Sequence, residues 1–189
     1  IMNVFYLDPR PADCAMMHCD KHVNKMIIEY AQILSTNHRI LDGYETYEMR
    51  LSEKTGREYK VKQYKLDSEL DSVLYKACHF NHPSTVWARQ NSENYTYLYK
   101  LWYNLSQEFY WRYGKIHLTY EKLYKVLPQL PENIPQGEFF EPPPAMGKFP
   151  ECIIPGDSLA SYHKYYRVAK KHFAKWTNRE IPGWFLLED

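Results

Sequence analysis

Polar side chains recur at spacings of three and four residues near the start of the chain. They are His18, Lys21, His22, Lys25, Glu29 and Gln32. This spacing places them on one face of an α-helix. Two amines, two imidazoles and a carboxylate on one face can perform nucleophilic or acid–base chemistry, because a lysine crowded by other cations has a lowered pKa. A solvated helix face with ordinary ion pairs, such as Lys25 with Glu29, has the same spacing.

A second candidate lies at the Asn81-His82-Pro83 sequence, just after His79. Pro83 disfavours helical geometry at His82, so we expect a rigid loop followed by a helix capped by Ser84. Such a loop presents the Asn81 amide and the His82 imidazole to a ligand, and the free N–H groups of a helix start favour phosphate. A histidine that only braces the turn is the alternative.

A third candidate consists of Arg112, Lys115 and His117, which flank Gly114. Gly114 is a typical stop signal for a helix, and positive charge at a helix C-terminus stabilises the helix dipole. The same groups suit a phosphate ligand, and both interpretations stay open.

A metal site is the weakest candidate. Cys14, His18 and His22 are spaced by four residues, and zinc uses such ligands. There is no Cys-x-x-Cys sequence, however, and Cys14 and Cys19 fall on the apolar stripe of the same segment. We therefore expect neither a metal nor another cofactor.

The elements that position these side chains are expected to be mainly α-helical. Apolar residues recur at helical spacing from Ala12 to about Leu34, and Ser84 to about Tyr113 has a similar pattern. These two long helices are preceded by a short strand from Asn3 to Leu7. Two partly alternating runs around Thr55-Gly56 predict a projecting β-hairpin.

Further helices are expected at residues 68–75, 119–127 and 157–176, the last with Lys170 and other basic residues on its outer face. We expect a single domain over residues 1–189, with the following parts: 1–43, strand and first helix; 44–66, hairpin insertion; 67–127, helical core; 128–155, proline-rich wrapping segment; 156–189, C-terminal helix and tail.

The composition restricts the function classes. The chain has 189 residues, 44% of them hydrophobic, and a formal net charge of +1, so a nucleic-acid partner would need locally concentrated basic groups. No apolar run approaches the length of a membrane span. With no export signal recognised, the four cysteines are expected to be reduced and the protein cytoplasmic.

Three blocks carry a family resemblance. The stretch from Asp20 to Leu34 resembles the first-helix motif of small bacterial proteins related to the pyrimidine-dimer DNA glycosylases, with His22 where arginine is usual. The run from Asn81 to Trp87 is similar to the His-His-Pro and tryptophan of that group. The run from Glu108 to Gly114 is similar to its Glu-Trp-x-x-Arg-Gly-Tyr ending. The chain also resembles uncharacterised proteins of tailed bacteriophages.

The resemblance implies base excision with β-elimination on damaged or modified DNA, with the target nucleotide flipped out. Glu29 is then the expected carboxylate, Lys21 or Lys25 the amine, and His22 a further catalytic group. The substrate-binding candidates are His18, Gln32, Asn81, His82, Trp87, Arg112 and Lys115. We expect Lys21, His22, Lys25, Glu29 and His82 to converge in one cleft.

Two other functions remain as alternatives. The nearly neutral charge favours a nucleotide-binding or nucleotide-modifying protein that does not contact DNA. The hairpin and the many tyrosines are also typical of a non-catalytic interaction protein, such as a phage inhibitor of a host factor.

Overall fold

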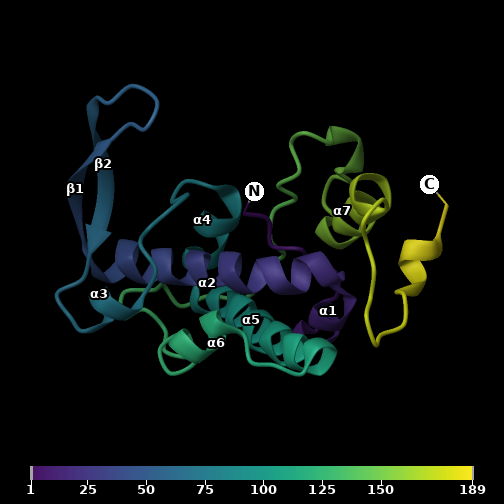
Figure 1. The fold of residues 1–189 in the computed structure, drawn as a ribbon. Coiled ribbons are helices and arrows are strands. Elements are labelled where there is room, and N and C mark those ends of the chain that lie inside the picture. Colours follow the sequence, from purple (N-terminus) through teal and green to yellow (C-terminus); the bar gives the residue numbers. More distant parts are fainter. Residues whose placement is uncertain (1, 189) are drawn as a thin grey trace.

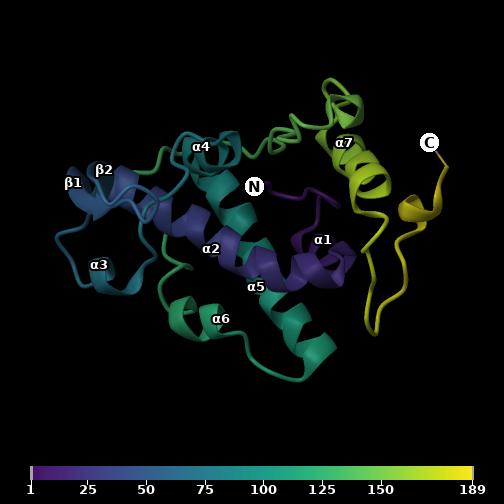
Figure 2. The same ribbon diagram turned by 45° about the horizontal axis from the view of Figure 1, so that its top comes forward.

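The computed structural model describes residues 2–188, so residues 1 and 189 lie outside the described chain. Helix α2 (Asp20–Asp42) runs through the middle of the molecule, with the hairpin at one end and α7 (Ser158–Tyr165) toward the other (Figure 1). Helix α5 (Ser92–Tyr113) crosses α2 and packs against it, as both ribbon views show (Figures 1 and 2). The expected mainly helical fold with a projecting hairpin is confirmed.

The first residues do not form the predicted strand. Residues 2–7 have no strand partner within the described chain, and side chains bond to their backbone instead. The Phe5 N–H donates to the Tyr30 hydroxyl at 3.1 Å and the Leu7 N–H to Cys14 Sγ at 3.4 Å, while Cys14 Sγ donates to the Phe5 carbonyl at 3.2 Å. These contacts replace the pairing that a strand requires, so the segment is buried extended chain.

The first long helix is broken in two, which corrects the prediction of one helix over residues 12–34. Helix α1 covers Pro11–Met17, and α2 begins at Asp20 after two extended residues, His18 and Cys19. The Asp20 N–H donates to the carbonyl of Lys175 at 2.8 Å. A contact with the C-terminal segment therefore satisfies a donor at the start of α2. Local sequence patterns cannot predict such a contact.

The second long helix is broken as well. Helix α4 covers Pro83–Gln90, and Asn91 leaves helical geometry before α5 begins. Asn91 Oδ1 accepts a hydrogen bond from the Asn94 N–H at 2.9 Å, and Asn91 Nδ2 donates to the Glu138 carbonyl at the same distance. Asn91 therefore caps α5 and fixes the proline-rich segment with one side chain.

The predicted end of α5 and the predicted hairpin are both confirmed. Gly114 adopts φ 66°, and its N–H donates to the Tyr110 carbonyl at 2.8 Å, as expected for a glycine that ends a helix. Strands β1 (Tyr44–Leu51) and β2 (Glu58–Lys65) form a two-stranded antiparallel sheet. Gly56, with φ 65°, lies in the turn between them.

The remaining helices are short. Helix α3 covers Leu70–Val73 and α6 covers Leu118–Leu123, both shorter than predicted. The proline-rich segment wraps around α4 and α5, where the Pro135 carbonyl accepts a hydrogen bond from the Ser92 N–H at 2.8 Å. No helix among residues 2–188 has both the length and the apolar character needed to cross a bilayer.

The C-terminal region packs back onto the first helices. Helix α7 ends at Tyr165 and is followed by a π-helical turn, Tyr166–Lys170, where the sequence predicted a regular helix to about residue 176. The tail then returns, with the Trp176 indole donating to the Met17 carbonyl at 2.9 Å. Trp184 stacks on His163 with ring centroids 4.0 Å apart.

Candidate functional site

The centre of the candidate site is an ion pair on α2. Lys25 Nζ lies 3.3 Å from Glu29 Oε1; the lysine side chain is 56% exposed and the glutamate side chain 13%. The second carboxylate oxygen, Glu29 Oε2, is buried and has no hydrogen-bond partner. A buried polar atom without a partner is costly, and no hydrogen bond offsets the burial of this oxygen. Gln32 lies partly exposed on the next turn of α2.

A third charged group, Lys170, comes from the π-helical turn after α7. Its Nζ lies 4.7 Å from the ring centroid of Tyr165 and 5.8 Å from that of Phe173. Partial burial lowers the pKa of Lys170, and the charge of Lys25 lowers it further. The sequence placed Lys170 on a solvated outer face, because the π-helical turn that redirects it has no signal in the residue pattern. Such turns are rare and frequently occur at functional sites.

An aromatic layer of His22, Phe5 and Tyr165 adjoins these amines. The rings of His22 and Phe5 stack with centroids 4.2 Å apart, and those of Phe5 and Tyr165 are nearly parallel at 6.1 Å. Burial holds the pKa of His22 well below its usual range, with the charges of His18, Lys170 and Lys25 contributing. His22 is therefore a neutral, buried ring, and the prediction that it shares an exposed face with the lysines is wrong.

Two other predicted site residues belong to the core. His18 is fully buried, with Nδ1 2.7 Å from the Cys14 carbonyl and Nε2 2.8 Å from the Tyr30 hydroxyl, and burial lowers its pKa to about 4. Trp87 is also buried, and its indole N–H donates to the Phe140 carbonyl at 2.8 Å. Both nitrogens of His18 are thus occupied by the protein. Among the described residues, no group of three or more acidic, His or Cys side chains is arranged to hold a metal.

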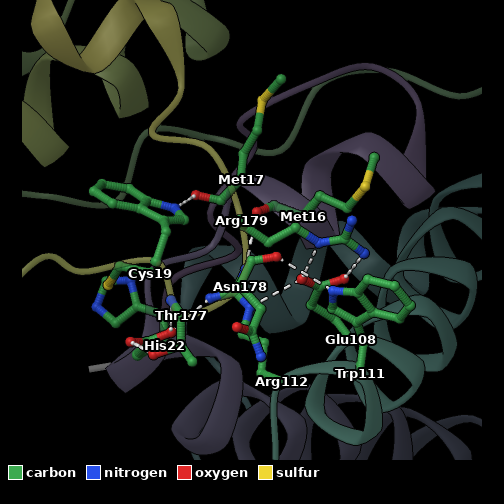
Figure 3. Close-up of polar contacts among 12 residues, drawn as sticks. Met16, Met17, Cys19, His22, Glu108, Trp111, Arg112, Thr177, Asn178 and Arg179 are labelled. Carbon is green, nitrogen blue, oxygen red and sulfur yellow. Dashed lines mark hydrogen bonds and ion pairs between the residues drawn. The ribbon is translucent and has the colours of Figure 1, made fainter.

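Arg112 lies in a buried charged network that fixes the helices and the tail. Its guanidinium contacts Asp20 Oδ1 at 3.0 Å and Glu108 Oε1 at 2.9 Å. Glu108 also binds Arg179 of the C-terminal tail at 2.7 Å, and Figure 3 shows Glu108 between the two arginines. These contacts join α5, the start of α2 and the tail, so Arg112 positions elements and has no exposed charge for a ligand.

The loop before α4 brings Cys78 within electrostatic range of Glu29. Burial raises the pKa of the Cys78 thiol, which the Glu29 carboxylate raises further and a hydrogen bond with Thr36 lowers. His82 Nδ1 accepts a hydrogen bond from the Ser84 N–H at 3.1 Å, so His82, and not Ser84, caps α4. Asn81 is exposed at this turn. His82 therefore braces the turn, which is the alternative role named for it in the sequence analysis.

The remaining predicted lysines, Lys21 and Lys115, meet in a surface hollow of about 400 Å³ between the start of α2 and the end of α5. Lys21 Nζ lies 4.6 Å from the ring centroid of Phe173, which also contacts Lys170. Lys21 and Lys170 therefore share the Phe173 ring, and Lys25 lies within electrostatic range of Lys170. We call these three side chains the lysine row. The structure brings Lys25, Glu29 and Lys170 together, and places Lys21 with Lys115 beside them.

Comparison with known proteins found no relative of this chain. No protein-family model, no curated protein and no solved structure matches the chain.

Proposed function

We propose that this protein is a DNA glycosylase/lyase-like enzyme that acts on damaged, modified or abasic nucleotides through a lysine imine. The observation that carries the proposal is the partly buried Lys170 amine, whose pKa is lowered beside the Lys25–Glu29 pair. A lysine must lose its proton to act as a nucleophile, and desolvation and a neighbouring cation both favour that loss. Lys25, by contrast, is more than half exposed and is held in an ion pair with Glu29.

The reaction uses these groups in order. The neutral Lys170 amine attacks C1′, the bond to lysine forms, and the base leaves with the proton that the amine gives up. Ring opening then gives an imine between lysine and the sugar. The Glu29 carboxylate takes a proton from C2′, the C3′–O bond breaks, and the phosphate leaves. Water hydrolyses the imine and restores the amine.

Local charge supports DNA as the partner. The chain as a whole has a net charge of only +1. The lysine row nevertheless concentrates three cations along one side of α2, of which one is paired with Glu29. Such a local concentration provides the electrostatic attraction to phosphates that the whole chain lacks.

Borohydride reduction on oligonucleotides that contain an abasic site or a modified base tests the proposal. We expect the unaltered protein to give a covalent adduct and Lys170→Arg to give none, because a guanidinium stays charged and forms no imine. Glu29→Gln should still form the adduct but cleave the strand about 10²–10⁴-fold more slowly. Lys171→Arg, an exposed neighbour, is the matched control and should behave as the unaltered protein. An adduct formed equally well by Lys170→Arg, or no adduct on any substrate, would contradict the proposal.

A further inference from the structure

The hollow between α2 and α5 is more positive than its residue types suggest. It is lined by Asp20, Lys21, Asn24, Phe109, Tyr113 and Lys115. The Asp20 carboxylate is fully used: Oδ1 contacts Arg112 at 3.0 Å and the Thr177 N–H at 3.0 Å, and Oδ2 accepts from the Thr177 hydroxyl at 2.8 Å. With this acid neutralised by the buried Arg112, two lysine charges remain at the surface.

A hydrogen-bond chain adds a neutral donor to the same hollow. His117 Nδ1 accepts from the Thr119 N–H at 3.1 Å, so in the neutral ring Nε2 carries the proton. Burial lowers the pKa of His117, which keeps the ring neutral. Nε2 then donates to Asn24 Oδ1 at 3.2 Å, leaving the Asn24 amide N–H₂ as a donor at the hollow.

We propose that this hollow binds a backbone phosphate of the DNA strand that enters the candidate site. Two amines and an amide donor suit a phosphate, and the walls of Phe109 and Tyr113 suit the adjoining sugar. The inference rests on the proposed function, which supplies DNA as the partner. Lys21 and Glu29 are eight residues apart on α2, or about 12 Å. When the DNA axis lies along α2, each strand advances about 3.4 Å per nucleotide along that axis, so the bound phosphate lies about three or four nucleotides from the reacting sugar.

Neutral-linkage scanning tests this placement. The probe is duplex DNA with one tetrahydrofuran abasic analogue, which binds without reacting, and a single methylphosphonate moved along the strand. The unaltered protein should lose several-fold affinity when the neutral linkage lies about three or four nucleotides from the analogue. Lys115→Ala should bind all-phosphate DNA several-fold more weakly, show no further loss at that linkage, and reduce the salt slope by about one.

The matched control is Lys100→Ala, an exposed lysine on α5 that is remote in sequence from the hollow and should keep the affinity of the unaltered protein. Unchanged affinity and salt slope in Lys115→Ala would overturn the inference. So would a melting-temperature rise with a free mononucleotide that Lys115→Ala abolishes while the linkage scan stays flat, since the hollow would then bind nucleotides and not a strand. Because the analogue cannot form an imine, this result is independent of the trapping experiment.

Discussion

Lys25 and Lys170 carry the same functional group in two environments. Lys25 is more than half exposed and paired with Glu29, whereas Lys170 is partly buried over the ring of Tyr165. The pairing of Lys25 with Glu29 could be predicted from their spacing of four residues. The role of Lys170 could not, because it depends on a π-helical turn and on packing against a segment about 140 residues away.

The pH dependence of adduct formation should report the lowered pKa of Lys170. The reactive amine is the neutral form, so the rate should rise with pH and level off below the range in which an ordinary lysine loses its proton. Replacing Lys25 with Gln removes a neighbouring positive charge, which raises the pKa of Lys170 and moves the profile to higher pH. The initial rate of borohydride trapping between pH 6 and pH 10 (about the ordinary lysine pKa) measures this. A profile that does not move in Lys25→Gln would contradict the assigned electrostatic contact.

Helix breaks decide which predicted site residues reach the surface. A single first helix would have placed His18 and His22 beside Lys21 and Lys25. The break at His18 and Cys19 instead turns His18 into the interior. His22 stays on α2 with the two lysines and is buried because the rings of Phe5, Tyr166 and Phe173 pack against it. The apolar stripe and the hairpin turn could be predicted from the sequence, because they follow from local periodicity and from the backbone conformations that glycine allows. The breaks were not, because their causes are contacts with the C-terminal and proline-rich segments.

The break between α4 and α5 depends on close packing at Gly137. A Cβ atom built on Gly137 would lie 2.7 Å from Asn91 Cβ, so Gly137→Ala should displace the cap of α5. We expect the free energy of unfolding to fall by about 1–3 kcal/mol. Gly147→Ala is the control in the same segment, since a Cβ there would meet nothing within 4 Å. Urea denaturation of both variants measures the difference, and equal stabilities would show that the glycine is not required.

Buried histidines, among them His18, His22 and His38, make polar contacts in the interior of the molecule. His38 Nε2 lies 2.8 Å from the Tyr95 hydroxyl, which donates to the Leu127 carbonyl at 3.0 Å, and burial lowers the pKa of His38 to about 4. The mainly helical class could be predicted from composition and periodicity. These interior polar contacts could not, because they join residues 57 and 32 positions apart in the sequence.

Stability should therefore decrease on acidification. A histidine whose folded pKa is below its unfolded value, about 6.5, takes up protons first in the unfolded state. The contribution of neutral His38 to the free energy of unfolding is fully present above about pH 6.5 and is lost as the pH falls toward 4. In His38→Gln, the decrease in the free energy of unfolding on acidification should be smaller by on the order of 3 kcal/mol. His172→Gln, at an exposed position, should leave it unchanged. Denaturant titrations at pH 7 and at about pH 4, the lowered pKa of His38, measure these free energies of unfolding. If His38→Gln and the unaltered protein lose the same stability between the two pH values, the lowered pKa of His38 is contradicted.

The identity of the reacting lysine is the most direct test of the central claim. The borohydride-reduced adduct with abasic DNA is digested with nuclease and protease, and the modified peptide is sequenced by mass spectrometry. The account predicts the sugar remnant on Lys170, within the π-helical turn after α7. A remnant on Lys21, Lys25 or any other amine would contradict it.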